Sequence, residues 1–468
     1  MSDKILKKID FFAQQGVKYT SIVFQLKRNN AGAYYFAEAQ KIEHELKFNF
    51  ETMGATPLFD ISASPRDDAA REMNKRFGLD RYFKIKFFNE NVNSVSYINE
   101  ILHAIALFSS VETVYPTAEP VTLRAASTHN GFQANKSDLD DEPKSPQKAE
   151  NHNFIPLQYY LWPARQCFNS FRLGGVDGTA GLNYAGGRGE NVTIITNEPD
   201  AWFTGHHNLP PERAIVEGTV TVGSDNTASV GVMAGLELGY GILGIASRAK
   251  VGYAARGLQY LYNLYYRLKA GDVIQIGMQH QGGNMSYYNQ ECYLPVECEP
   301  AWFDMISALT SKGIHVIEAA GNGAANLDHP ALNGKFNRNL KDSGAIIVGA
   351  LDPRTGLRAA YSNFGSRIDS SSWGDFVVTT SYGYATLLNK TNAWYINNFS
   401  GNSPANPIVA GVAACLSSIA IANKQSLTAL QFRELLTSTG TVLAENFSSI
   451  IGTQPDLAKA IYALFSKY

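Results

Sequence analysis

The 468-residue chain is poor in cysteine, in excess charge and in long apolar runs. Its formal net charge of −2 gives no electrostatic reason to expect a nucleic acid or an anionic membrane as partner. No apolar run looks long enough to span a bilayer, and the first ten residues lack the apolar core of a secretory signal. We therefore expect a cytoplasmic protein, or one that is exported by an unconventional route.

The low cysteine content excludes a fold held together by disulfides, because four cysteines are too few for a chain of this length. Cys292 and Cys298 lie close together and could bridge in an oxidising compartment, but without an export signal we favour free thiols. No stretch carries carboxylates at a spacing typical of calcium ligands, so we assign no metal site and no cofactor.

The length predicts two domains. In residues 1–120, segments that alternate as strands do, such as 21–26 and 82–87, occur with segments of helical spacing, such as 94–108. These patterns predict a small α/β domain. Residues 121–153 are polar and poor in apolar side chains, which is typical of a flexible linker.

From residue 154 to residue 468, continuous apolar strands alternate with helical segments. Such runs are typical of parallel strands that are buried on both faces. We therefore predict a doubly wound, mostly parallel sheet with helices on both faces, in which a site would lie at the carboxyl ends of the strands. The strands are expected at residues 192–195, 250–254, 272–277, 313–320 and 344–350.

Residues 399–411 read as a tight turn followed directly by a helix, with Ser403 at the mouth of that helix. Gly401 permits an unusual backbone conformation, and Pro407 fits a first helical turn. The run Gly-Asn-Ser-Pro-Ala-Asn-Pro-Ile-Val-Ala-Gly resembles the nucleophile segment of the subtilisin-like serine peptidases (subtilases), Gly-Thr-Ser-x-Ala-x-Pro-x-Val-Ala-Gly. Asn402 replaces the threonine of that pattern. The resemblance makes Ser403 the candidate nucleophile.

The resemblance implies a subtilisin-like fold, serine endopeptidase activity and a peptide or protein as substrate. It also implies that residues 1–120 act as an inhibitory propeptide that assists folding; an unrelated accessory domain is the alternative. If that propeptide is cut off, the cleavage would fall in the linker.

Two further segments extend the resemblance. Ala-Ala-Gly-Asn-Gly at residues 319–323 is similar to the oxyanion segment of subtilases, in which the amide of Asn322 would stabilise a developing negative charge. A turn asparagine with only a structural role is the alternative. Gln279, Gly282 and Gly283 fall where subtilases pair their backbone with the substrate.

Two positions of the subtilase triad hold other residues. Asp225 and Asn226 stand where the family has the general-base histidine and the glycine after it, and Thr196 stands where it has the aspartate. A carboxylate is a weaker base than an imidazole near neutral pH, and a threonine cannot stabilise a charged base. Glu198 and Asp200 follow Thr196 closely but do not fall on the motif.

The histidines offer no evident replacement for the missing base. His206 and His207 resemble a turn of the family in which the histidine is not catalytic, and we expect both to be exposed. His280 follows a predicted strand, and we expect it to be a surface residue.

Three hypotheses follow. The first is a pseudopeptidase that keeps the groove, Asn322 and Ser403, and binds a peptide or protein, including its own N-terminal domain. The second is an active serine endopeptidase in which Asp225, with Glu198 as its partner, replaces the histidine. The third is a structural or interaction protein in which the groove is vestigial.

Overall fold

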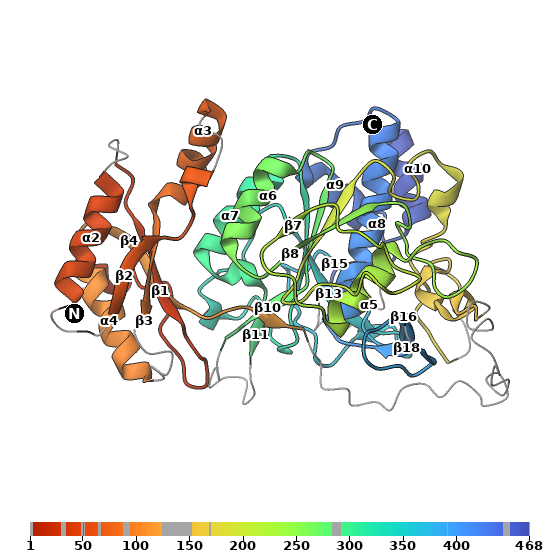
Figure 1. Ribbon diagram of the computed structural model, residues 1–468, viewed down its shortest axis with the longest axis horizontal. Coiled ribbons are helices and arrows are strands. Elements are labelled where there is room, and N and C mark those ends of the chain that lie inside the picture. Colours follow the sequence, from red (N-terminus) through yellow and green to blue (C-terminus); the bar gives the residue numbers. More distant parts are fainter. Residues whose placement is uncertain are drawn as a thin grey trace.

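The protein consists of a small N-terminal domain packed against a larger α/β domain (Figure 1). The smaller domain runs from red to orange along the sequence in Figure 1, and the larger from yellow to blue. The computed structural model describes residues 3–29, 34–47, 50, 52–63, 67–87, 94–123, 152–167, 170–282, 292–390, 392–442 and 450–467.

The N-terminal domain is built on one antiparallel sheet with the strand order β2-β3-β1-β4. Ile22 and Phe24 of β1 share a core with α2 and α4, whereas Val23 shares one with the larger domain. Because side chains alternate along a strand, both faces of this sheet are buried. Its elements are α1 (Asp3–Leu6), β1 (Ser21–Leu26), α2 (Tyr34–Leu46), β2 (Thr52–Pro57), α3 (Asp68–Phe77), β3 (Tyr82–Phe87), α4 (Val95–Leu107) and β4 (Val111–Thr117).

The larger domain contains a mostly parallel sheet with the strand order β14-β13-β12-β9-β6-β8-β7, and β15 also pairs with β13. Only β14 runs antiparallel to its neighbour among these described strands. The prediction of a mostly parallel sheet is confirmed. The strands are β6 (Thr193–Asn197), β7 (Val216–Glu217), β8 (Lys250–Ala254), β9 (Val273–Ile276), β12 (His315–Ala319), β13 (Ile346–Asp352), β14 (Leu357–Arg358) and β15 (Ser370–Trp373).

Helices cover both faces of this sheet, as the sequence predicts. Ile195 of β6 packs in one core with α6 and α7, on the side of the N-terminal domain. Its neighbour Ile194 packs in the other core, with α5 and α8. The helices are α5 (Ser224–Ala234), α6 (Leu258–Arg267), α7 (Pro300–Ser311), α8 (Asn402–Ala422), α9 (Ala429–Ser438) and α10 (Leu457–Lys467).

Two small sheets lie beside the main one. The first joins β5 (Val121–Thr122), β10 (Met278–Gln281) and β11 (Tyr293–Leu294), and the second joins β16 (Val377–Thr380), β17 (Leu388–Lys390) and β18 (Ala393–Phe399). Residues 121–123 therefore do not belong to a linker as predicted, because their backbone pairs with the larger domain. The rest of that predicted linker, up to residue 151, lies outside the described residues.

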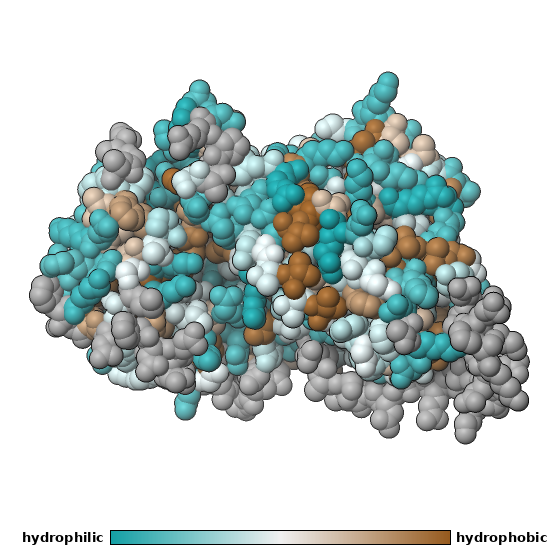
Figure 2. All heavy atoms as spheres, in the orientation of Figure 1, coloured by the Kyte–Doolittle hydropathy of each residue, from teal (hydrophilic) through white to brown (hydrophobic). Residues whose placement is uncertain are grey.

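Helix α8 is the central helix of the larger domain. By length and composition it is apolar enough to cross a membrane, contrary to our expectation from the sequence, but 89% of its 18-residue apolar window is buried inside the protein. Its small residues allow this close packing. The surface in Figure 2 is mostly hydrophilic, with apolar side chains gathered over the sheet edge at β7, where Val216 is 39% exposed.

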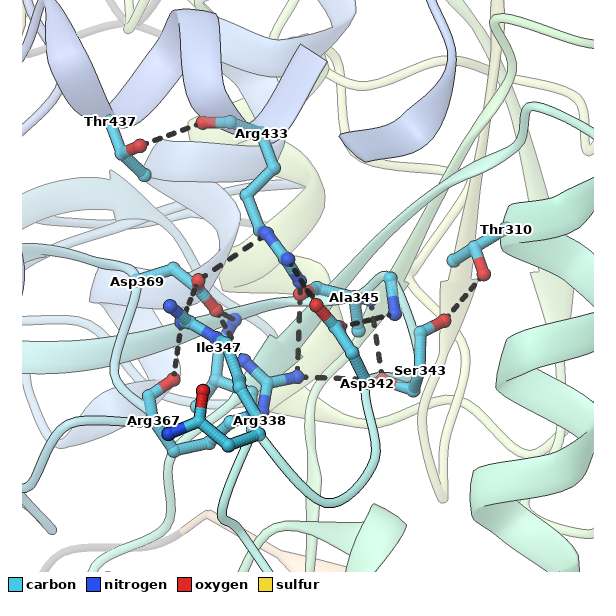
Figure 3. Close-up of polar contacts among 12 residues, drawn as sticks. Thr310, Arg338, Asp342, Ser343, Ala345, Ile347, Arg367, Asp369, Arg433 and Thr437 are labelled. Atoms are coloured by element: carbon cyan, nitrogen blue, oxygen red, sulfur yellow. Dashed lines mark hydrogen bonds and ion pairs between the residues drawn. The ribbon is translucent and has the colours of Figure 1, made fainter. Parts of the chain in front are cut away.

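A buried ion network joins the loops before β13 and β15 to α9 (Figure 3). Arg367 donates to Glu297 (Nε–Oε1 2.9 Å) and to Asp369 (Nη1–Oδ2 2.5 Å), and the three side chains are 1–2% exposed. Asp369 also accepts from Arg338 and lies 3.6 Å from Nε of Arg433. Charges that are removed from water need such partners, so the network holds these segments together.

Candidate active site

The structure brings Ser403 and Asn322 together, as the sequence predicts. Ser403 lies in the first turn of α8, after Gly401, whose φ of 103° favours glycine. Asn322 follows the carboxyl end of β12. Both belong to the edge of the sheet where a site is expected.

Asn402 fixes the orientation of the Asn322 side chain. Oδ1 of Asn322 accepts hydrogen bonds from the backbone N–H (3.0 Å) and the side-chain amide (2.7 Å) of Asn402. With its oxygen engaged in this way, Asn322 directs its NH₂ group toward the groove. Asn402 was recognised in the sequence only as a departure from the family pattern, and nothing in that pattern indicated this contact.

The groove holds a strand of the protein itself. The short strand β5 pairs antiparallel with β10, with Thr122 opposite Met278 and Val121 opposite Gln279. Leu123, the next residue, is 1% exposed. This arrangement is that of a peptide lying along a binding groove by strand addition.

The carbonyl oxygen of Leu123 accepts hydrogen bonds from both residues of the candidate site, Ser403 and Asn322. Ser403 Oγ donates to it at 3.0 Å, and the amide of Asn322 donates to it at 2.5 Å. Two donors that converge on one carbonyl oxygen are what an oxyanion hole provides. The bond that follows, to Arg124, leads out of the described residues.

Gln279 connects the bound strand to the oxyanion loop. Its side-chain NH₂ donates to the carbonyl of Thr122 (3.1 Å), and its Oε1 accepts from the backbone N–H of Asn322 (2.8 Å). The sequence suggested a backbone role here, whereas the structure adds the side chain. Gly282 instead bonds Cys292 through its backbone N–H (2.6 Å), and Gly283 lies outside the described residues.

The positions of the missing triad residues hold a neutral pair. Thr196, fully buried at the end of β6, accepts a hydrogen bond from the amide of Asn226 at 2.9 Å. Asn226 also donates to the carbonyl of Asp200 at 2.7 Å. Asp225 is half-buried in the first turn of α5. In the described part of the chain, Ser403 Oγ makes its hydrogen bond to Leu123 and none to either triad position.

Glu198, two residues after Thr196, has a carboxyl whose pKa is shifted from its ordinary value. Burial raises its pKa well above the ordinary value, a bond from Gln275 opposes the rise, and the charges of Asp200 and Asp225 add to it. Nε2 of Gln275 donates both to Glu198 (3.0 Å) and to Asn406 of α8 (2.7 Å). Glu198 therefore accepts a hydrogen bond from a buried amide on the neighbouring strand. The hypothesis of a carboxylate base would instead require Glu198 to bond to Asp225.

Two histidine predictions are wrong. His206 is 1% exposed: its Nε2 bonds the carbonyl of Trp394 (3.0 Å), its Nδ1 accepts from the N–H of Asn208 (3.1 Å), and burial lowers its pKa to about 4. His280 is 3% exposed because the N-terminal domain packs over β10. The burial of His206 depends on β18, which is distant in sequence, and that of His280 depends on how the domains dock. No local sequence pattern shows either contact.

The four cysteines are free thiols, as favoured from the sequence. Cys292, Cys298 and Cys415 are buried, and Cys167 is exposed.

A parallel α/β sheet that presents a serine at a helix mouth and an amide at a neighbouring strand end defines the class of the subtilisin-like serine peptidases. The chain belongs to it: the model of the Subtilase family matches residues 217–453, just over half of the chain. This establishes a subtilisin-like serine peptidase homologue.

Relatives of known name agree with this class. The chain is 26% identical over 273 residues to the alkaline elastase YaB of Bacillus sp.. This match covers 58% of each of the two chains. It is 31% identical over 146 residues to an extracellular protease of Xanthomonas campestris pv. campestris, covering 31% of this chain and 23% of that protein. The chain thus spans less than two thirds of the length of either relative.

The fold is also that of a solved structure. Fervidolysin from Fervidobacterium pennivorans, described as a keratinolytic enzyme related to subtilisin, superposes with a TM-score of 0.58 at 16% identity. The match covers 97% of this chain and 63% of that one. At this identity the likeness concerns the fold alone.

Proposed function

We propose that this subtilase homologue is a pseudopeptidase: it binds a peptide strand in its groove and does not turn it over efficiently. The observation that carries the proposal is the carbonyl of Leu123, held by Ser403 and Asn322 while Thr196 and Asn226 form a neutral pair. The ligand is a peptide or protein segment with an aliphatic residue at the position of Leu123. Residues 1–123 act on the groove as a propeptide-like domain.

The chemistry of the triad supports this proposal. A serine hydroxyl attacks a carbonyl only when a base takes up its proton, and the same base later protonates the leaving amine. In subtilisin, loss of the serine or the histidine alone lowers kcat by about 2 × 10⁶. Here Ser403 Oγ donates a hydrogen bond to the carbonyl oxygen of Leu123. It therefore adds a second donor to the one that Asn322 supplies.

An active serine endopeptidase with a carboxylate base is the second candidate. Glu198 favours it, because its buried carboxyl has a raised pKa and is flanked by Asp200 and Asp225. Its hydrogen bond to Gln275 directs it toward the sheet, which is why we rank this candidate second. A vestigial groove ranks third, because three side chains still bond to the strand that occupies it.

A fluorophosphonate probe, which reacts with activated serines, tests the proposal. In the intact protein Leu123 covers Ser403, so the groove is first opened with Leu123→Asp, whose buried charge disfavours docking. We expect no labelling of this variant. Adding Thr196→Asp, Asp225→His and Asn226→Gly places the family's residues at all three positions, and we expect this variant to be labelled.

Ser403→Ala in the same opened background is the matched control. Strong labelling of the Leu123→Asp variant that Ser403→Ala abolishes would overturn the proposal in favour of an active peptidase. Labelling that is lost in Glu198→Gln would then identify Glu198 as the group responsible. Mass spectrometry of the purified chain adds a second readout, since we expect no Ser403-dependent cleavage after Leu123.

A further inference from the structure

The N-terminal domain docks through hydroxyl groups that contact carboxyls of the larger domain. Thr117 of β4 donates to Oε1 and Oε2 of Glu299 at 2.9 and 3.0 Å. Tyr82 of β3 donates to Oδ2 of Asp304 at 2.7 Å. Glu299, directly before α7, is 4% exposed. The docked domain therefore contacts a carboxyl that is buried in the protein.

His280 of β10 lies beside Glu299 on the wall of a cavity between the domains. Its Nε2 is 3.7 Å from Oε2 of Glu299 and has no hydrogen-bond partner in the described residues. The ring stands edge-on to Trp302 with centroids 6.0 Å apart. The N-terminal side of this cavity is formed by Asp10, Phe11, Gln14, Tyr19 and Ala118.

Burial acts on both members of this pair. It raises the pKa of Glu299 to about 8; the bond from Thr117 and the charge of Lys335 oppose the rise, and Asp10 and Glu119 add to it. Burial also lowers the pKa of His280 to about 3. Other ionisable groups around the pair are Tyr19, Tyr115 and Cys298, whose pKa values burial raises, and the ion pair between Lys335 and Asp10.

Counting protons gives the direction of the effect. With the domain docked, His280 and Glu299 together hold one proton from about pH 3 to about pH 8. For the undocked state we assign both groups their ordinary pKa values of 6.5 and 4.5, which leave the pair with no proton above pH 6.5. Docking therefore takes up one proton between about pH 6.5 and pH 8. It must weaken as pH rises through this window.

We infer that the N-terminal domain is a proton-dependent latch: it closes the groove when the His280–Glu299 pair carries one proton, and it loosens in alkaline solution. The inference rests on the proposed function, because the docked domain is what places Leu123 in the groove. Asp304 takes up its proton at lower pH, because its pKa is about 6 in the docked protein and ordinarily 3.8. The latch therefore operates through Glu299 in neutral and alkaline solution.

Hydrogen exchange of the full chain, followed by mass spectrometry at pH 6.5, 7, 7.5 and 8, tests the latch. The exchange rate of peptides that contain β5 and β10 is divided by the rate in Glu299→Gln at the same pH, which cancels the intrinsic pH dependence of exchange. We expect this ratio to rise about tenfold per pH unit, or about 30-fold over the window. A ratio that is constant with pH would overturn the inference.

His280→Leu provides a second variant, with a different signature. Without the histidine, the proton uptake of Glu299 is no longer offset below pH 6.5, so the pH dependence of exchange should extend down to about pH 4.5. A window that stays at pH 6.5 to 8 would count against the pair. The matched control is Glu112→Gln, at a 51% exposed carboxylate of the same domain, which should keep the wild-type window.

Binding of the peptide acetyl-Val-Thr-Leu-amide separates the latch from the proposed function. If the Leu123→Asp variant binds this peptide but exchange in the wild type is insensitive to pH, the latch alone is wrong. If exchange follows the expected window but the opened groove binds no peptide, the latch stands and the proposed function fails.

Discussion

The side-chain amide of Asn402 donates to Oδ1 of Asn322 at 2.7 Å and to the carbonyl of Gly321 at 2.9 Å. Because Asn402 is fully buried, these bonds have no competition from water. They help to decide which end of the Asn322 amide faces the Leu123 carbonyl, so the oxyanion site is oriented by a residue whose own described hydrogen bonds go to the 321–322 loop.

Asn402→Ala should therefore lower the free energy of unfolding by about 1–3 kcal/mol, because it leaves buried hydrogen-bonding groups without partners. It should also weaken peptide binding in the Leu123→Asp background, since Oδ1 of Asn322 then keeps only the hydrogen bond from the backbone N–H of position 402. Denaturant unfolding and peptide titration measure the two effects. Asn339→Ala, at an exposed asparagine, is the control and should change stability by less than about 0.5 kcal/mol.

Arg367→Met should destabilise the protein by about 3–5 kcal/mol, because it leaves Glu297 and Asp369 buried without their shared cation. Urea unfolding gives the difference. Arg354→Ala removes an ion pair whose members are 38% and 20% exposed, and it should cost less than about 1 kcal/mol. Equal effects of the two substitutions would show that burial of the network contributes nothing.

Glu198→Gln should make stability less dependent on pH. Burial raises the pKa of Glu198 in the folded protein, so its contribution is present below pH 4.5 and is lost as pH rises toward the folded value. The wild type should thus lose up to about 1.4 kcal/mol per pH unit relative to the variant over this range. Urea midpoints from pH 5 to pH 9 test this, with exposed Glu190→Gln as control. Parallel pH profiles of the wild type and Glu198→Gln would contradict this prediction.

Leu123→Ala should loosen the bound strand without introducing a charge. Truncating a fully buried leucine costs about 2–5 kcal/mol when the site cannot collapse, and Leu123 is 1% exposed. Faster hydrogen exchange in β5 relative to the wild type measures this loss. Leu107→Ala, at a leucine that is 65% exposed, should leave that exchange unchanged.

The sequence allowed the fold to be predicted, and also the two site residues Ser403 and Asn322. Continuous apolar strands and the segments around Ser403 and Asn322 are local patterns, and the structure places them as expected. The contacts that the sequence did not reveal are long-range. The strand at Val121 adopts its conformation by pairing with β10, about 160 residues away in sequence, and the polar residues after it masked that role. The burial of His280 likewise follows from how two domains dock, which no local pattern contains.

The occupied groove has a consequence for any measurement of affinity. A strand that belongs to the same chain competes with added peptide at an effective concentration, which for short flexible connections is on the order of millimolar. The affinity measured on the intact chain is the intrinsic affinity multiplied by the fraction of molecules whose groove is empty. A weak apparent affinity is therefore compatible with a tight site, and dissociation of the internal strand sets the fastest rate at which an outside ligand can enter.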